Sequence, residues 1–327
     1  MEKTNLIKEH TLPAQSRRSS RLPFDLALPV VAAPMFLLSG PELVIAGAKA
    51  GIVATLPALN ARSSELFDQW LAQVTTEIAR HKAAHPDQLT GPLAVNLVTH
   101  RSNERLEADL AVVVKYKVPI VFTAVGDPKS VNEAVHSYGG LVFADVASIR
   151  HARRAIDGGV DGLVLLCAGA GGNCGKLNPF AFVPAVRQFW DGPIALAGAI
   201  GDGRAIAAMQ MLGADLAYMG TRFIATYESL ASEQYREMLV TSDADDVVLT
   251  DEVTGIPANL LRSSLVKCGF APDGTRNGTG IDVNKEVEVF KRWKDIWSAG
   301  QGVGATDRIC SVAEVIIQLK NEYQLHC

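Results

Sequence analysis

The stretch PIALAGAIGDGRAIAAMQMLGADLAYMG (193–220) holds two short apolar runs separated by a segment with the pattern of a helix. The runs at 193–200 and 214–220 are almost continuously apolar instead of alternating with polar residues. Continuous apolar strands are covered on both faces, as in parallel sheets, and a helix is the usual connection between parallel neighbours. This stretch therefore predicts one strand–helix–strand unit of an α/β fold.

The same unit recurs along most of the chain. Apolar runs lie at 29–35, 52–56, 92–97, 119–125, 141–146, 162–168, 193–200 and 214–220, each followed by a helical segment. Eight strand–helix units fit a (β/α)8 TIM barrel. A doubly wound sheet would carry GxGxxG after an early strand, whereas the first run here continues as APMFLLSG (33–40). We therefore predict the barrel.

The strand–helix rhythm stops near residue 229. We expect an N-terminal arm at 1–27, the barrel at 28–228, an additional helical lid subdomain at 229–300 and a C-terminal helix at 301–327 that packs on the barrel. The basic RRSSR at 17–21 falls in the arm. Because chain termini are usually solvated, we interpret it as exposed to solvent and not as a binding site.

The composition of the 327 residues indicates a globular protein with a sizeable core, since 48% are hydrophobic and 20% charged. A net charge of -4 without a basic stripe argues against nucleic acid, and no apolar run reaches the ~18 residues of a membrane helix. The first residues lack the apolar core of a signal peptide, so we expect a cytoplasmic protein. Five cysteines without CxxC spacing indicate reduced thiols and no metal site.

Glycine-rich turns follow the last two runs and open the next helical segments. They read AGAIGDGR (197–204) and MGTR (219–222). Free N–H groups at a helix N-terminus favour an anion, and the loops after the seventh and eighth strands are the recurrent phosphate site of such barrels. The two turns together predict a ligand that carries a phosphate.

Two further features indicate a flat ring. Asn96 ends the third run, and its amide offers a donor and an acceptor to a planar heterocycle. The stretch CAGAGGNCG (167–175) follows the sixth run and presents bare backbone that a flat ligand can approach closely. A phosphate and a flat ring together point to FMN, with the ring across the mouth of the barrel.

Taken together, the motifs AAPM (32–35), VN (95–96), FADV (143–146), AGAGGNCG (168–175), AGAIGDGRA (197–205), GADLAYMGTRFIAT (213–226) and WSAGQG (297–302) resemble the nitronate monooxygenase family, long called 2-nitropropane dioxygenases. The resemblance runs from about Leu28 to Gly304 and implies a lidded barrel with one non-covalent FMN. It implies a cofactor site of Ala33, Pro34, Met35 and Asn96 at the ring, Ala170, Gly171 and Gly172 beside it, Gly198, Ala199, Gly220 and Thr221 at the phosphate, and Ser298 and Gln301 nearby.

Two positions depart from the family pattern. Members usually carry AGGH after the sixth strand, where this chain has Asn173, and close members read FHDV where this chain has Ala144. An imidazole takes up a proton near neutral pH, whereas a carboxamide offers hydrogen bonds alone. We therefore expect proton abstraction from a neutral nitroalkane to be impaired. An alkyl nitronate needs no base, and Asn173 could donate a hydrogen bond to it.

Asp145 and Cys174 are the other candidates for chemistry. Asp145 either acts in the site or caps the helix that begins near Ser148, and we prefer the cap. Cys174 is interpreted as packing and not as a nucleophile, because no histidine lies near it in the sequence.

Three functions follow from this reading. The leading hypothesis is an FMN-dependent oxidoreductase that oxidises alkyl nitronates with O2. The second is a flavin reductase fed by NAD(P)H that acts on quinones or enoyl thioesters, and the third is a flavin-binding protein that has lost catalysis. The sequence leaves open the identity of the small-molecule substrate and whether identical chains form an oligomer.

Overall fold

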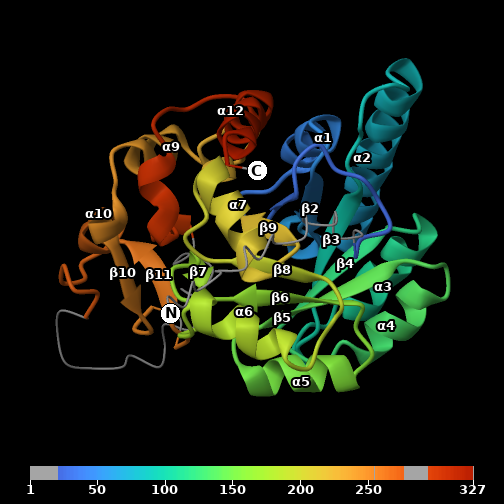
Figure 1. The fold of residues 1–327 in the computed structure, drawn as a ribbon, viewed down its shortest axis with the longest axis horizontal. Helices are drawn as coiled ribbons and strands as arrows, with labels where there is room; N and C mark the ends of the chain where they lie inside the picture. Colours follow the sequence, from blue (N-terminus) through green and yellow to red (C-terminus); the bar gives the residue numbers. More distant parts are fainter. Residues whose placement is uncertain (1–20, 254, 276–293, 327) are drawn as a thin grey trace, which may run out of the picture.

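Eight parallel strands form a closed barrel in the computed structural model, which describes residues 21–253, 255–275 and 294–326. The strands are β1 (Val30–Ala32), β2 (Val53–Pro57), β3 (Leu93–Val98), β4 (Ile120–Ala124), β5 (Leu141–Val146), β6 (Gly162–Leu166), β8 (Ile194–Ala197) and β9 (Leu216–Met219). They pair in chain order, and β9 closes the barrel by pairing with β1 (Figure 1). Each strand falls on one of the eight apolar runs, with β2 and β3 extending one residue beyond theirs, so the predicted TIM barrel is confirmed.

Helices cover the outside of the barrel. They are α1 (Pro41–Lys49), α2 (Ser64–Ala84), α3 (Leu106–Lys115), α4 (Lys129–His136), α5 (Ile149–Asp157), α6 (Pro179–Arg187), α7 (Gly203–Leu212) and the short α8 (Thr221–Ile224), with a 3-10 turn η1 (Ala58–Asn60) after β2. In the strand–helix–strand unit at 193–220, the Asp202 side chain caps α7 by accepting from the Ala205 N–H at 2.7 Å. Gly213 ends this helix with a φ of 112°, a left-handed conformation that glycine adopts without strain.

The hydrophobic core has an outer layer between strands and helices and an inner layer inside the barrel. In the inner layer the ring of Phe122 contacts those of Phe143 and Tyr218, with centroids 5.4 Å and 5.2 Å apart. These aromatic side chains fill the barrel, as expected for a packed interior that is not a pore.

The lid, residues 229–300, is mixed and not purely helical. It contains α9 (Glu233–Val240), η2 (Ala244–Asp246), β10 (Val247–Thr250), β11 (Ala258–Leu261) and α10 (Arg262–Lys267). The antiparallel sheet β10-β11-β7 takes its third strand, β7 (Gly172–Asn173), from the loop after β6. Figure 1 shows this sheet beside the barrel, away from α3 and α4. The expectation of a helical lid therefore needs this correction, and its part at 276–293 lies outside the described residues.

The C-terminal helix α12 (Val312–Gln324), which follows the 3-10 turn η4 (Gln301–Ala305), lies on its own barrel against α7 and α1 (Figure 1). The Gly203 N–H at the start of α7 donates to Glu322 at 2.8 Å. The contact is close, because a Cβ on Gly203 would lie 2.3 Å from the Tyr323 backbone nitrogen.

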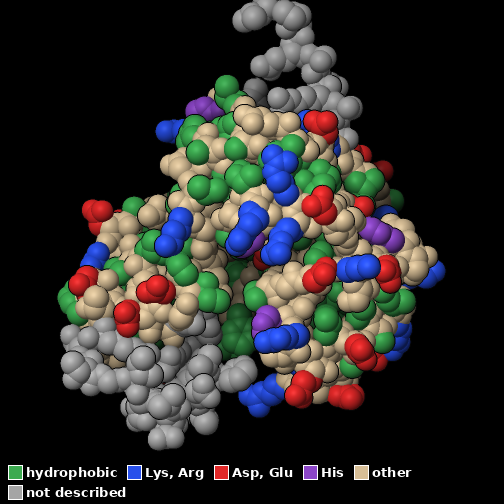
Figure 2. Space-filling model, turned by 90° about the horizontal axis from the view of Figure 1, so that it is seen from below, with side chains coloured by type: hydrophobic (Ala, Val, Ile, Leu, Met, Phe, Trp, Pro, Cys, Tyr) green, Lys and Arg blue, Asp and Glu red, His purple; other side chains and the backbone are tan. Residues whose placement is uncertain are grey.

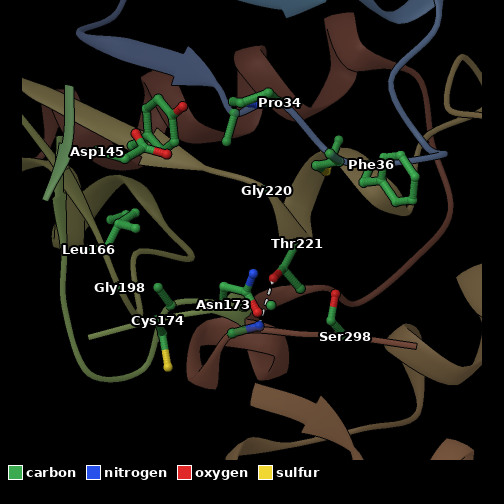
Figure 3. A pocket seen from close by; sticks show the side chains of 18 of the residues that line it. Pro34, Phe36, Asp145, Leu166, Asn173, Cys174, Gly198, Gly220, Thr221 and Ser298 are labelled. Carbon is green, nitrogen blue, oxygen red and sulfur yellow. Dashed lines mark hydrogen bonds between the residues drawn. The ribbon is translucent and has the colours of Figure 1, made fainter. Parts of the chain in front are cut away.

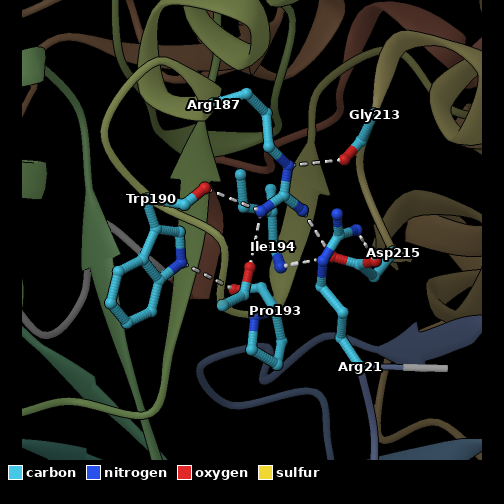
Figure 4. Close-up of polar contacts among 8 residues, drawn as sticks. Arg21, Arg187, Trp190, Pro193, Ile194, Gly213 and Asp215 are labelled. Carbon is cyan, nitrogen blue, oxygen red and sulfur yellow. Dashed lines mark hydrogen bonds and ion pairs between the residues drawn. The ribbon is translucent and has the colours of Figure 1, made fainter. Parts of the chain in front are cut away.

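An ion-pair network ties the amino-terminal ends of β8 and β9 together (Figure 4). Asp215 accepts from Arg187 at 2.6 Å, from the Ile194 N–H at 2.8 Å and from Arg21 at 2.9 Å. Arg21, the last residue of RRSSR, is exposed as expected and also forms an ion pair with Asp215. Residues 17–20 lie outside the described part of the chain.

The molecular surface mixes charged and apolar side chains. Figure 2 shows a face with scattered basic and acidic side chains and a central hollow that has hydrophobic side chains in its depth. Within the described ranges, no helix is long and apolar enough to cross a membrane.

Candidate active site

A cavity of about 560 Å³ lies at the carboxyl ends of the barrel strands. Each strand contributes lining residues at or just after its end, namely Ala33, Pro57, Asn96, Ala124, Asp145, Leu166, Ala197 and Met219. Active sites of TIM barrels lie at this end, and the volume is in the usual range of small-molecule sites.

The cavity brings together nearly all the site residues that were predicted from the sequence. Its lining includes Ala33, Pro34, Met35, Asn96, Asp145, Ala170, Gly171, Gly172, Asn173, Gly198, Ala199, Gly220, Thr221 and Ser298. Gln301 is the exception: its side chain is exposed, and its backbone N–H donates to the Gly169 carbonyl at 2.9 Å. Its neighbours Gly300 and Gly302 line the cavity, and its side-chain oxygen lies beside Gly169 of the lining, so Gln301 borders the cavity and its role at the cofactor stays a prediction.

Some of the glycines in CAGAGGNCG (167–175) are needed for close packing against other backbone of the protein. A Cβ on Gly171 would lie 2.7 Å from the Gly300 nitrogen, and one on Gly300 would lie 2.8 Å from the Gly169 oxygen. Here glycine allows two chain segments to pack backbone against backbone. Gly172 differs, because a Cβ there would lie 3.9 Å from its nearest neighbour, while its φ of 66° favours glycine.

The predicted phosphate end is partly used by internal hydrogen bonds. The Ala199 N–H donates to the Gly169 carbonyl at 3.2 Å, so it is not free for an anion. The Thr221 hydroxyl accepts from the Gly300 N–H at 2.9 Å, which leaves its own hydrogen available as a donor (Figure 3). The α8 helix begins at Thr221, where the first N–H groups of a helix have no partner within it, and the Phe223 N–H donates to the Gly220 carbonyl at 2.8 Å.

Asn173 lies where the barrel meets the lid. It pairs with Ala258 of β11, and the next residue, Cys174, donates its N–H to the Pro257 carbonyl at 3.1 Å. Buried Asn259 donates to the Ala170 carbonyl at 2.7 Å, so β11 holds the loop along its length. Figure 3 shows Asn173, Thr221 and Ser298 on one side of the cavity, across from Pro34 and Asp145. Asn259 was not among the site residues predicted from the sequence.

Ser298 is held at the cavity by Tyr235 of α9. The Tyr235 hydroxyl donates to the Ser298 carbonyl at 2.5 Å and accepts from its N–H at 3.0 Å. The Tyr235 ring also stacks on Trp297, with centroids 4.9 Å apart. The lid thus fixes the backbone of Ser298 while its hydroxyl lines the cavity. Sequence reasoning missed Tyr235.

Asp145 belongs to the cavity and not to a helix cap. Ser148 caps α5, with its hydroxyl accepting from the His151 N–H at 3.2 Å. The preferred interpretation of Asp145 as the cap is therefore wrong, because Ser148 directly precedes the helix while Asp145 lies within β5. The Asp145 Oδ1 atom is buried with no hydrogen-bond partner among the described residues, and burial raises the pKa of this carboxyl to about 7.

Tyr218 and His151 also line the cavity, and the sequence reasoning missed both. The buried Tyr218 hydroxyl lacks a partner in the described structure, and burial, followed by the charge of Asp145, raises its pKa well above the usual value. His151 brings an imidazole from the first turn of α5. Ala144, in contrast, packs in the outer core layer and does not line the cavity. A histidine at position 144 would likewise point toward the outer core layer and would bring no imidazole into this cavity.

Cys174 is packed and unsuited to act as a nucleophile. Its Sγ atom lies 3.5 Å from the Asn259 amide nitrogen, and burial raises the pKa of the thiol. Reactive cysteines have lowered pKa values in electropositive surroundings. Among the described residues no lysine or arginine lines the cavity, and no group of three or more His, Cys, Asp or Glu side chains could hold a metal ion.

Comparison with known proteins places the chain in a family. The family model for nitronate monooxygenase matches residues 22–322. The chain belongs to the nitronate monooxygenase family. A nitronate monooxygenase of Paraburkholderia phytofirmans is 28% identical over 272 residues, which cover 78% of this chain and 72% of that protein. A (3aS,4S,5R,7aS)-5-hydroxy-7a-methyl-1-oxo-octahydro-1H-indene-4-carboxyl-CoA dehydrogenase of Rhodococcus jostii is 26% identical over 238 residues, or 73% of this chain and 64% of that relative.

Solved structures support the fold of this nitronate monooxygenase family member. FabK from Thermotoga maritima superposes with a TM-score of 0.76 at 24% identity, covering 92% of this chain and 94% of that one. A nitroalkane oxidase from Streptomyces ansochromogenes gives a TM-score of 0.73 at 23% identity, with coverage of 92% and 97%. At these low sequence identities, the superpositions establish only the fold, namely the barrel and its accessory region.

Proposed function

We propose that this chain is an FMN-dependent oxidoreductase that oxidises alkyl nitronates with O2. The observation that carries the proposal is the cavity at the carboxyl ends of the strands. Glycine backbone and hydrogen-bond donors line it, and no lysine or arginine does so among the described residues. Membership of the nitronate monooxygenase family supports flavin chemistry at this place.

The residues at the cavity fit FMN at both ends of the molecule. Gly220 and Thr221 both line the cavity, and together they offer N–H and hydroxyl donors suited to a phosphate. The Asn96 amide donates one hydrogen bond to the Phe122 carbonyl at 3.2 Å, which leaves its oxygen for a ring N–H. Bound FMN would supply an acceptor for the electrons of the substrate.

Asn173 determines the preferred charge of the substrate. A carboxamide cannot accept the α-proton of a neutral nitroalkane, but its N–H group can donate to a nitronate that is already an anion. We propose that Asn173 stands where family members carry histidine, so that the chain favours substrates deprotonated before they bind. Oxidation then requires donors for the anion, and the Ser298 hydroxyl offers a second one at the cavity.

Two measurements test this function. The purified protein should show flavin absorbance or acquire it when mixed with FMN, and it should consume O2 with an alkyl nitronate. Removal of FMN should abolish the oxygen consumption and re-addition should restore it. A protein that takes up no FMN would contradict the proposal.

A second candidate is a reductase or dehydrogenase of acyl thioesters or quinones that exchanges electrons with NAD(P)H. Relatives at 26% identity are named for a carboxyl-CoA substrate, which favours this alternative. Anaerobic bleaching of the flavin by NADH or NADPH would support it. If both nicotinamides leave the flavin absorbance unchanged while an alkyl nitronate bleaches it, this second function is excluded.

A further inference from the structure

The bottom of the cavity is formed by side chains that point into the barrel. Side chains alternate along a strand, so Phe143 and Asp145 of β5 point to the same interior. The Phe122 ring packs on both Phe143 and Tyr218, and these aromatic rings close the barrel below the cavity. Asp145 and Tyr218 therefore place polar atoms on top of an aromatic layer.

These polar atoms lack the partners that buried groups normally have. Neither the Asp145 Oδ1 atom nor the Tyr218 hydroxyl has a hydrogen-bond partner in the described part of the chain, although both residues line the cavity. Tyr218 is 7% exposed, so water at the surface does not solvate its hydroxyl. Most buried polar groups in proteins are hydrogen-bonded, and each exception calls for a missing partner. Both residues line the cavity, and the charge of Asp145 acts on Tyr218, so the two groups lie near one another beside the place where a ligand would bind.

We propose that Asp145 in its protonated form and Tyr218 donate hydrogen bonds to one negatively charged oxygen of the substrate. This inference rests on the proposed function insofar as it takes the substrate to be a planar oxyanion such as a nitronate. The two donors come from β5 and β9, and both residues line the same cavity. The pair would act beside Asn173 as a cavity-bottom anion site.

The surroundings favour the neutral carboxylic acid over the carboxylate. The other titratable groups that line the cavity are His151 on α5, Cys174 beside β7 and Tyr218 on β9. None of these is a permanent cation, and an ionised Asp145 would repel an anionic substrate. Burial moves the pKa of Asp145 to about 7, so a large fraction is protonated at neutral pH. A carboxylic acid kept neutral in an apolar site becomes a hydrogen-bond donor to an oxyanion.

Benzoate is a suitable probe, because it is planar, carries two oxygens like a nitronate and is ionised from about pH 6 to 9. Its dissociation constant would be measured by titration calorimetry on the full chain, with and without FMN. The variants are Tyr218→Phe and Asp145→Asn. Tyr138→Phe is the matched control, because the Tyr138 hydroxyl donates to the Val118 carbonyl and does not line the cavity.

Tyr218→Phe is expected to weaken benzoate binding at least tenfold, as for the loss of one hydrogen bond to a charged group, while Tyr138→Phe leaves it unchanged. Wild-type affinity should fall as Asp145 ionises above about pH 7. Asp145→Asn should abolish this pH dependence, because a carboxamide donates at every pH, and should bind benzoate more tightly than the wild type at about pH 8.5.

Equal affinities for Tyr218→Phe and Tyr138→Phe would overturn the donor pair. So would an unchanged pH dependence in Asp145→Asn, or wild-type affinity that stays constant or rises between about pH 6 and 9, because ionisation of Asp145 removes a donor and adds a negative charge. If Asp145→Asn does not fold, the wild-type pH profile and Tyr218→Phe still decide. Failure to bind FMN contradicts the proposed function, whereas titration of the FMN-free chain tests the donor pair independently.

Discussion

Asn173 of the loop after β6 pairs with Ala258 of the lid strand β11, so the residue that faces the cavity is held by the lid and not by the barrel alone. This pairing makes position 173 a defined place in a small sheet, although it lies in a glycine-rich loop. A different side chain at position 173 would therefore also point toward the cavity. Substitution at 173 is therefore an informative probe of the chemistry in the cavity.

Asn173→His should increase turnover of a neutral nitroalkane, because an imidazole can accept the α-proton. A positioned general base accelerates such a step by roughly 10²–10⁴. The measurement is oxygen consumption with the nitroalkane, and Asn173→Gln is the control that keeps a carboxamide. If histidine and glutamine give the same rate as the wild type, position 173 does not take part in the reaction.

Asp145→Asn should change how stability depends on pH. The pKa of Asp145 rises from 3.8 to about 7 on folding, so the folded protein keeps a proton that the unfolded chain releases between these values. Wild-type stability then falls as pH rises through this window, by up to about 1.4 kcal/mol per pH unit, and levels off above about pH 7. The asparagine variant lacks this decline. Urea denaturation of both proteins between about pH 5 and 8 measures it, and parallel profiles would refute the raised pKa.

Tyr235→Phe should loosen the segment that carries Ser298. The variant keeps the stacking on Trp297 but leaves the Ser298 N–H and carbonyl without their hydroxyl partner. An unpaired buried group costs about 1–3 kcal/mol, so we expect a loss of this size in the free energy of unfolding together with weaker FMN binding. Fluorescence titration with FMN checks the second effect. Affinity equal to that of Tyr138→Phe would show that the lid contact does not position the site.

Asp215→Asn should destabilise the fold without altering the chemistry. It weakens the ion pair with Arg187 and the contact with Arg21 at the amino-terminal end of the barrel, away from the cavity. Breaking a largely buried pair costs about 3 kcal/mol or more. Thermal unfolding should shift to lower temperature, while kcat/KM per folded molecule stays the same. A selective loss of kcat/KM with unchanged stability would contradict this separation.

The barrel was predictable because eight continuous apolar runs, each followed by a helical segment, recur along the chain. The two-residue strand β7 was not, because a glycine-rich loop has no periodicity and its pairing with β11 depends on residues more than 80 positions away. The glycine turns and Asn96 were found because helix ends and strand ends have local signatures. Tyr218 and His151 were missed, because their direction depends on the strand alternation inside the barrel and on the start of α5.

The misplaced residues have equally physical explanations. Gln301 lies beside the cavity with its side-chain oxygen near Gly169, while the packing of Gly300 and Gly302 against neighbouring backbone fixes the path of that segment. Ala144 faces the helices because Asp145, its neighbour on β5, faces the barrel interior. Sequence resemblance identifies which residues belong to a site, whereas the direction of each side chain follows from the backbone.

The most direct test of the account is oxygen consumption by the FMN-loaded protein with an alkyl nitronate and with the neutral nitroalkane of the same compound. A missing general base is worth roughly 10²–10⁴ in rate, so the nitronate should be oxidised at least a hundredfold faster. His151→Gln, which removes the imidazole that lines the cavity, should leave this ratio unchanged. Equal rates on the two forms would contradict the account, because they would require a base that removes the α-proton in this cavity.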